Sequence, residues 1–336
     1  MSRRTTDDDL PRQYRLLEVP DAGTGMRLDQ FLASRFGTRS RTELVRGIRR
    51  GLVTDEADRP LRPSATVAAG QRLRLYLPGI APSSTPPPFP PILYEDDRVV
   101  VLDKPPGLPC HPGGTAFTWA VVGLARTRWP DRCADLVHRL DKETSGALVL
   151  TKDREANAYL KRVFKEGGAV KEYVALCRGH VPWEHRVIDA PIGPAEGPIR
   201  IQRAVRPDGL SAFTEAWVEA RTIGTDPPLT RLRVRLHTGR THQIRVHLAH
   251  IGHGIVGDRM YGVPPAVFLH YYEEGLDDWV VEQAGAPRHA LHAASIRFPH
   301  PDGTEVSVEA PLPADMARWW ADPALLPCGG HSDRCD

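Results

Sequence analysis

The stretch His138-Arg139-Leu140-Asp141-Lys142-Glu143-Thr144-Ser145-Gly146, followed at once by Ala147-Leu148-Val149-Leu150, is the most informative part of this chain. The apolar run predicts a buried strand. The polar residues before it then form a tight turn that fixes the direction of the Asp141 carboxylate, as a catalytic acid requires. A structural turn, in which Asp141 caps backbone amides, fits the same spacing. From this stretch alone, both interpretations stand.

Five further motifs occur along the chain in a fixed order. They are Lys104-Pro105-Pro106-Gly107, Lys171-Glu172-Tyr173-Val174-Ala175-Leu176, Thr238-Gly239-Arg240-Thr241-His242-Gln243-Ile244-Arg245-Val246-His247, Gly257-Asp258-Arg259-Met260-Tyr261-Gly262 and Arg288-His289-Ala290-Leu291-His292-Ala293. Together with the stretch around Asp141, they resemble the RluA-type pseudouridine synthases over residues 92–320. One such motif would be weak evidence, but the ordered set is specific.

The resemblance implies both a fold and a reaction. The expected fold is α+β: a catalytic domain on a mixed, largely antiparallel sheet with a central cleft, preceded by a small α+β RNA-binding domain. The expected reaction isomerises uridine to pseudouridine in structured RNA, with large-subunit ribosomal RNA favoured over transfer RNA. The isomerisation needs no redox change and no energy input, so no cofactor is expected. The sequence agrees, because it has neither a phosphate-binding loop nor a Rossmann fingerprint.

The resemblance also assigns roles to individual residues. It places the reactive carboxylate at Asp141, an aromatic ring against the flipped uracil at Tyr173, and the cation that keeps Asp141 ionised at Arg245. Contacts with RNA are expected from three further residues of these motifs, Arg139, Arg240 and His242. Judged by residue type alone, Arg245 as a phosphate clamp and Tyr173 as an ordinary core residue are the alternatives.

A basic segment lies upstream of these motifs. Residues 25–53 carry seven arginines against two acids. Leu28, Phe31, Leu32 and Phe36 fall at helical spacing and predict one short helix. Ser40-Arg41-Thr42-Glu43 reads as the capped start of a second helix, and the alternation over residues 72–77 predicts a strand. Clustered arginines of this kind are typical of nucleic-acid binding.

This basic segment resembles the small RNA-binding module named for ribosomal protein S-four. The resemblance implies that the second helix contacts RNA through Arg41, Arg46, Arg49 and Arg50. Thr54-Asp55-Glu56-Ala57 departs from the turn that this family often has at that position. A small helical cap with solvated arginines is the alternative.

A second basic stripe is expected in the catalytic domain. Leu232, Val234 and Leu236 alternate with Arg231, Arg233 and Arg235, which predicts a strand with one buried and one basic face. No acid occurs between residues 231 and 247. We therefore expect this stripe also to contact RNA. A helix is predicted directly after the Gly239 turn, from the spacing of Ile244, His247, Leu248 and Ile251.

Changes in composition along the chain predict its domains. Residues 1–24 are expected to be flexible, residues 25–78 to form the small domain, and residues 92–320 to form the catalytic domain. Six prolines between positions 79 and 91 predict a semi-rigid linker. Residues 263–287 are interpreted as an insertion, and residues 321–336 as a disordered tail.

Composition limits the setting of the protein. No apolar run is long enough to span a bilayer, and the N-terminus turns acidic where a signal peptide would turn apolar, so a cytoplasmic protein is expected. We expect it to be a monomer. Five widely spaced cysteines argue against a disulfide framework. Five histidines between positions 237 and 253 suggest a metal site, but their spacing and the absence of a supporting motif argue against one.

Two other functions fit parts of the sequence. A catalytically idle RNA-binding factor for ribosome assembly would keep this scaffold, but it would have no physical need for Asp141, Tyr173 and Arg245 together. A glycosidic hydrolase would break the same bond. It would require a second acid about 5–9.5 Å from the first, and no acid in the motifs suggests itself for that role.

Overall fold

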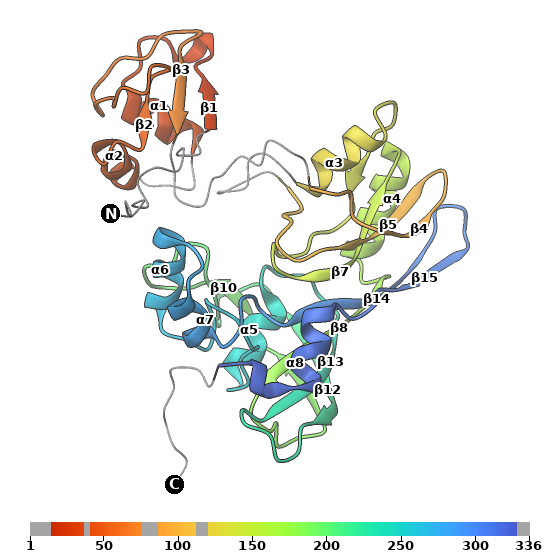
Figure 1. The fold of residues 1–336 in the computed structure, drawn as a ribbon. Coiled ribbons are helices and arrows are strands. Elements are labelled where there is room, and N and C mark those ends of the chain that lie inside the picture. Colours follow the sequence, from red (N-terminus) through yellow and green to blue (C-terminus); the bar gives the residue numbers. More distant parts are fainter. Residues whose placement is uncertain (1–14, 37–40, 76–86, 112–119, 328–336) are drawn as a thin grey trace, which may run out of the picture. The chain divides into compact units, whose positions relative to one another are not determined.

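The computed structural model describes residues 15–36, 41–75, 87–111 and 120–327 (Figure 1). The described residues up to position 75 belong to one compact unit, and those from position 87 onward belong to a second, larger one. No helix in these described ranges is long and apolar enough to cross a membrane. Most of the predicted linker, residues 79–86, lies outside the described ranges.

The small unit is an α+β structure. It contains β1 (Arg15–Glu18), a 3₁₀ turn η2 (Asp21–Gly23), α1 (Leu28–Arg35), α2 (Arg41–Arg49), β2 (Val53–Thr54) and β3 (Arg72–Leu75). The strands form an antiparallel sheet in the order β1-β3-β2. Both predicted helices are present because their apolar residues form a common core, which includes Leu28, Phe31, Leu32, Leu44 and Ile48. Ser40 of the predicted capping box lies outside the described residues.

The predicted flexible segment over residues 1–24 is wrong for its last part. Arg15–Glu18 form β1, in which Leu17 pairs with Leu73 of β3. Val19 then enters the core of the small unit, where it is 1% exposed. A four-residue strand with only two apolar positions is too short to show a period, and its partner lies more than fifty residues away. The first 14 residues lie outside the described ranges.

The large unit is built on one ten-stranded sheet. The main path runs β4-β5-β7-β14-β8-β13-β12-β9, with β15 on β14 and β6 on β7. The strands are β4 (Ile92–Glu95), β5 (Val99–Lys104), β6 (Asp135–Leu136), β7 (Ser145–Thr151), β8 (Val170–Arg178), β9 (His185–Asp189), β12 (Phe213–Arg221), β13 (Leu229–Leu236), β14 (Leu291–Pro299) and β15 (Glu305–Glu309). A separate two-stranded sheet consists of β10 (Ile192–Pro194) and β11 (Arg203–Val205).

The sheet is mixed but largely antiparallel, as the sequence predicted. Its one parallel pair is β7 with β14, which cross the middle of the large unit (Figure 1). Every residue of β7 is buried, which explains its continuous apolar sequence. Gly146 has a φ of 105°, and a Cβ there would lie 2.2 Å from the carbonyl oxygen of Ala293. Only glycine therefore permits this close approach of the two central strands.

Helices cover both faces of the sheet. They are α3 (Val121–Arg128), α4 (Arg154–Lys165), α5 (Gln243–His250), α6 (Pro265–Glu274), α7 (Asp278–Ala284) and α8 (Ala314–Ala321), followed by the 3₁₀ turn η3 (Pro323–Leu325). Alternate residues of β5 enter different cores: Val100 and Leu102 pack with α3, whereas Val101 packs with Leu160 of α4. The predicted helix after the Gly239 turn is α5. The predicted insertion forms α6 and α7, which pack against each other.

The predicted tail is also wrong for its first part. Pro323 lies buried in η3, and Leu326 is 4% exposed within the main core. The segment after α8 therefore packs against the large unit as far as residue 327. Its lack of periodicity concealed this, because a 3₁₀ turn needs only one or two apolar anchors. Residues 328–336 lie outside the described ranges.

Candidate active site

Asp141 lies on a turn between β6 and β7 that is fixed from two sides. On one side, Nε2 of His138 accepts a hydrogen bond from the backbone N–H of Val149, 3.1 Å away, and the imidazole stacks on the ring of Phe164. Burial lowers the pKa of His138 to about 3, so this imidazole is neutral. It is a structural anchor of the turn that carries Asp141.

Lys104 fixes the turn from the other side. Its ammonium is fully buried and donates to the carbonyl oxygens of Pro105, Leu108 and Lys142, at 2.8, 2.9 and 3.0 Å. The N–H of Gly107 donates to the same Lys142 carbonyl. Two of the predicted motifs therefore meet here: the lysine–proline–glycine segment holds the backbone directly after Asp141.

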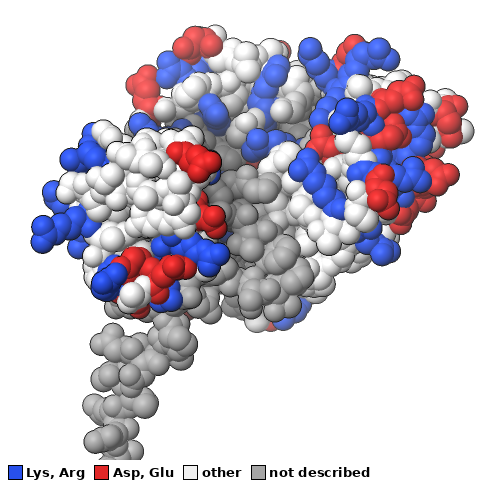
Figure 2. Space-filling model, turned by 90° about the horizontal axis from the view of Figure 1, so that it is seen from above, with Lys and Arg blue, Asp and Glu red and all other residues white. Residues whose placement is uncertain are grey.

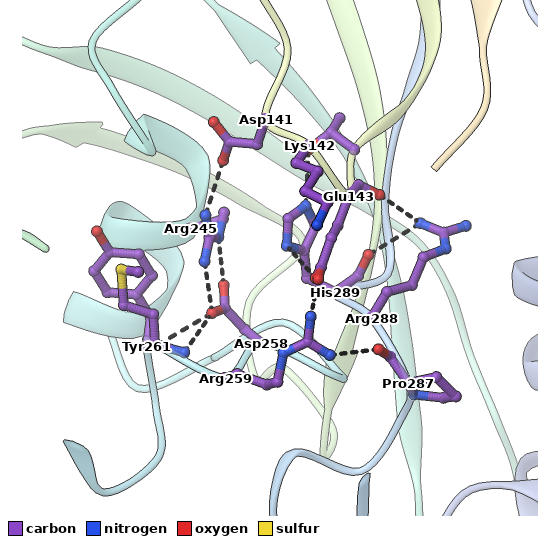
Figure 3. Close-up of polar contacts among 12 residues, drawn as sticks. Asp141, Lys142, Glu143, Arg245, Asp258, Arg259, Tyr261, Pro287, Arg288 and His289 are labelled. Carbon is purple, nitrogen blue, oxygen red and sulfur yellow. Dashed lines mark hydrogen bonds and ion pairs between the residues drawn. The ribbon is translucent and has the colours of Figure 1, made fainter. Parts of the chain in front are cut away.

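Arg245 connects Asp141 to a second carboxylate. Nη1 of Arg245 donates to Oδ2 of Asp141 at 2.9 Å, while Nε and Nη2 bind both oxygens of Asp258 at 2.6 and 2.9 Å. Asp258 is 1% exposed, and its Oδ1 also accepts the N–H groups of Met260 and Tyr261. The guanidinium therefore lies between the two acids, held by one and aimed at the other (Figure 3).

This arrangement keeps Asp141 ionised. Burial opposes its charge, but the charge that His242 carries when protonated and the guanidinium of Arg245 outweigh that effect, and the pKa of Asp141 lies well below its usual range. Arg245 is the cation present at neutral pH, since burial lowers the pKa of His242 to about 4. The Asp141 side chain is 21% exposed, so a charged carboxylate faces the pocket.

The helix that carries Arg245 is itself fixed by a buried glutamine. Oε1 of Gln243 accepts the Thr238 hydroxyl and the Arg240 backbone N–H, and its Nε2 donates to Phe213 and Thr214 of β12. These bonds close the Gly239 turn and attach the start of α5 to the sheet. They explain why Arg245 reaches Asp141 from a distant part of the sequence.

All six residues that the sequence placed in the catalytic domain line one pocket; they are Arg139, Asp141, Tyr173, Arg240, His242 and Arg245. Tyr173 is 6% exposed, and burial together with the charge of Asp141 raises its pKa. Its hydroxyl is therefore protonated at neutral pH. Arg139 and Arg240 are exposed, and Nε of Arg240 donates to the carbonyl of Ser211.

The arginines of β13 do not belong to this pocket. Val234 of β13 pairs with Tyr173 of β8, so both side chains lie on the pocket face of the sheet, and Arg233 and Arg235 lie on the opposite face. Both of these arginines bind Glu172 of β8, at 3.1 and 2.6 Å. Arg233 and Arg235 therefore lie outside the pocket, on the opposite face of the sheet, where they share one acid of the neighbouring strand.

One face of the molecule also carries charges of both signs. On the face seen in Figure 2, basic and acidic side chains are interspersed. Within the small unit, Arg41 binds the buried Asp29 at 2.8 Å and so joins α2 to α1. Arg46, Arg49 and Arg50 are exposed and pair with no carboxylate of the described residues.

Two site residues received no role from the sequence, Asp258 and Tyr261. Their motif was noticed, but nothing in its spacing showed that Asp258 would hold Arg245. The Tyr261 hydroxyl lies 2.8 Å from Nδ1 of His242. The available signal was an acid, Asp258, inside one of the motifs that carry the resemblance.

A second network supports the turn from below (Figure 3). Glu143 forms an ion pair with Arg259, and the hydroxyl of Thr144 lies 2.8 Å from Nε2 of His289. Arg288 donates to the Glu143 carbonyl at 3.2 Å and binds both oxygens of Asp315 of α8. The residues on both sides of Asp141 are therefore anchored to distant parts of the chain.

Comparison with known proteins agrees with this geometry. The sequence profile for RNA pseudouridylate synthase matches residues 98–250, which include the turn of Asp141, Tyr173 and Arg245. An RNA pseudouridine synthase of Aquifex aeolicus is 38% identical over 74% of this chain and 80% of its own length. The chain belongs to the RNA pseudouridine synthase family.

Two further relatives extend the match. The ribosomal large subunit pseudouridine synthase D of Xanthomonas campestris is 34% identical to this pseudouridine synthase, over 93% of each chain. Among solved structures, human RNA pseudouridylate synthase domain containing 1 superimposes with a TM-score of 0.53 and 26% identity, covering 68% of this chain and 86% of that one. The protein is thus an RNA-modifying isomerase with the α+β fold of its family.

Proposed function

We propose that this pseudouridine synthase isomerises uridine in large-subunit ribosomal RNA, with Asp141 as the reacting carboxylate. The observation that carries the proposal is the buried ion pair: Asp141 is ionised, partly exposed to a pocket, and held by Arg245 at 2.9 Å. The relatives named for the ribosomal large subunit support the choice of RNA.

The reaction moves one bond and one proton. The bond between N1 of uracil and C1′ of ribose breaks, the base turns, and C5 bonds to C1′ while C5 loses its proton and N1 gains one. The Asp141 carboxylate either attacks C1′ or removes a sugar proton as the base leaves as an anion. Both routes need a charged carboxylate whose direction is fixed, which is what Arg245 and the anchored turn supply.

The remaining pocket residues suit a flipped base. A uridine inside folded RNA must leave its stack to enter the pocket. The Tyr173 ring would lie against the uracil, where stacking contributes about 1–3 kcal/mol per base. Arg139 would fill the vacated stack, and Arg240 would contact the RNA backbone. The protonated Tyr173 hydroxyl is in addition able to exchange a proton at the base.

The small unit would anchor the RNA. Arg46, Arg49 and Arg50 are exposed on or next to α2 and have the chemistry of phosphate contacts. Arg41 is partly committed to Asp29, so it would contribute less. The resemblance of the small unit to the S-four type module fits this role. An enzyme of ribosomal RNA would act in the cytoplasm, where ribosomes assemble, and we propose that it acts as a monomer.

Mapping pseudouridines in large-subunit ribosomal RNA tests the substrate. RNA from cells that carry the gene, from cells that lack it, and from cells complemented with the Asp141→Asn variant would be compared. We expect one or a few pseudouridines to disappear in the deletion strain and to stay absent with the variant. An unchanged map in ribosomal RNA, with losses confined to transfer RNA, would overturn the choice of substrate but not the reaction.

A further inference from the structure

His242 has an unusual backbone conformation next to Asp141. Its φ is 60°, in the left-handed region, and only Asp58 among the other described non-glycine residues shares a positive φ. Such a conformation is costly for a residue with a side chain and persists where the surroundings enforce it. Here it begins α5 and accompanies an imidazole that lines the pocket, with Nε2 3.8 Å from Oδ1 of Asp141.

The hydrogen bonds around Tyr261 determine where His242 carries its proton. The oxygen of Tyr261 accepts the N–H of Arg203 at 2.9 Å and lies 2.8 Å from Nδ1 of His242. The Tyr261 hydroxyl can donate its own proton to Nδ1 of His242, provided that Nδ1 carries no proton. This network therefore assigns the imidazole proton to Nε2, the nitrogen that faces Asp141.

The charges of the two rings agree with this assignment. Burial lowers the pKa of His242 to about 4, so its imidazole is neutral at neutral pH. Burial also raises the pKa of Tyr261, so its hydroxyl keeps the proton that it donates. Both side chains are largely buried, Tyr261 at 6% exposed and His242 at 12%. The chain from Arg203 through Tyr261 to His242 thus ends in a fixed, uncharged N–H group at the pocket.

We propose that this Nε2–H of His242 is a hydrogen-bond donor to a carbonyl oxygen of the uracil ring. The inference rests on the proposed reaction at Asp141. When the N1–C1′ bond breaks, its electron pair goes to uracil, and the negative charge spreads over N1, O2 and O4. A preorganised donor aimed at that charge lowers the barrier, and His242 transfers no proton in the step.

A neutral donor is the form that this position requires. A charged imidazolium 3.8 Å from Asp141 would form an ion pair with the carboxylate and compete with the substrate for it. A neutral imidazole leaves Asp141 paired only to Arg245 and still offers one N–H group. Tyr261 acts through His242 by fixing the tautomer and is therefore a positioning residue.

The rival explanation is purely structural: His242 holds Tyr261 and starts α5. Two substitutions separate the explanations. In His242→Asn, the amide lies near the Nδ1 position and can hold Tyr261, and asparagine tolerates a positive φ, but no group reaches the Nε2 position. In His242→Gln, the longer amide can place an N–H group near the Nε2 position, although glutamine fits the backbone less well.

The experiment measures single-turnover rates and RNA dissociation constants of both variants on a structured fragment of large-subunit ribosomal RNA, with thermal unfolding as a control. We expect His242→Asn to lose about a hundredfold in rate, as when one donor to a developing oxyanion is removed. His242→Gln should keep a rate at least about tenfold above that of His242→Asn, and both should bind RNA like the wild type. A rate for His242→Asn equal to or above that of His242→Gln would overturn the proposal.

A double-mutant cycle tests the role of Tyr261. Tyr261→Phe should slow the wild-type reaction about tenfold, but it should not slow His242→Asn further, because the tyrosine acts through the imidazole. Additive losses would overturn this role. The Asp141→Asn variant distinguishes a failure of the proposed reaction from a failure of the proposed role of His242. If it retains activity, the proposed reaction fails; if it is inactive while His242→Asn is fully active, only the present inference fails.

Discussion

Replacing Arg245 with methionine tests whether this guanidinium keeps Asp141 ionised. Methionine keeps much of the aliphatic volume but has no charge, so the effect of burial on Asp141 is no longer opposed at neutral pH. Losing an opposite charge at this distance raises a carboxylate pKa by about 1–3 units. Because the Asp141 side chain is 21% exposed and partly screened by water, we expect the lower part of that range, about 1–2 units.

The activity and the stability of the variant follow from that shift. The acid limb of the kcat/KM profile should move to higher pH by the same amount. Removing one partner of a buried ion pair lowers the free energy of unfolding by about 3–5 kcal/mol. This cost applies to Arg245→Met because Asp258 also loses its cation. A lowered carboxylate pKa contributes stability that is fully present above the pKa of the unfolded state, about 3.9, and is lost as the pH falls through the pKa of the folded state. The loss of unfolding free energy should therefore be full at neutral pH and shrink in acid.

The assay follows release of tritium from C5 of labelled uridine, since that proton leaves during the isomerisation. Arg245→Lys is the matched control, because it keeps the charge but not the paired contact with Asp258. Its acid limb should lie close to that of the wild type. An acid limb that stays in place in Arg245→Met, whatever the rate, would refute the claim that Arg245 sets the charge of Asp141.

Three further predictions concern the surroundings of this pair. Asp258→Asn should lower kcat and reduce the free energy of unfolding by up to about 3 kcal/mol, because Arg245 loses its buried anchor; an unchanged kcat would show that Arg245 needs no such support. Deleting residues 1–85 should leave a folded catalytic unit whose log–log salt dependence of RNA binding is flatter by about two to three units, since three phosphate contacts are lost. Equal slopes would mean that the small unit does not touch RNA. Replacing both Arg233 and Arg235 with glutamine should leave RNA affinity unchanged within about twofold, because they lie opposite the pocket and bind Glu172; a large loss in a filter-binding assay would place RNA on that face.

The sequence predicted those strands and helices whose apolar residues recur in a clear pattern. The continuous run of β7 and the alternation of β13 both gave the correct strands, and the helical spacing after Gly239 gave α5. The short β1 and the segment after α8 were missed, because four residues or a single 3₁₀ turn carry too little pattern. Their order comes from tertiary contacts that the local sequence does not contain.

The candidate site likewise has features that the sequence predicted and features that it did not. The six residues that the resemblance assigned to the site in the catalytic domain line one pocket, because its motifs are segments of the pocket lining. Two features were hidden because their partners lie on other elements. The sequence around Arg233 and Arg235 contains no acid, but in the fold both arginines bind Glu172 of β8. Asp258, 13 residues after Arg245, could be recognised as its anchor only from the fold.

Asp141→Asn, compared with the wild type on the same ribosomal RNA fragment, tests directly whether the Asp141 carboxylate reacts. Asparagine keeps the size and most hydrogen bonds of the side chain but removes the charge. We predict that pseudouridine formation disappears while the RNA dissociation constant stays within about threefold, because phosphate contacts elsewhere dominate the affinity. A turnover rate within about tenfold of the wild type would show that the Asp141 carboxylate does not carry the reaction.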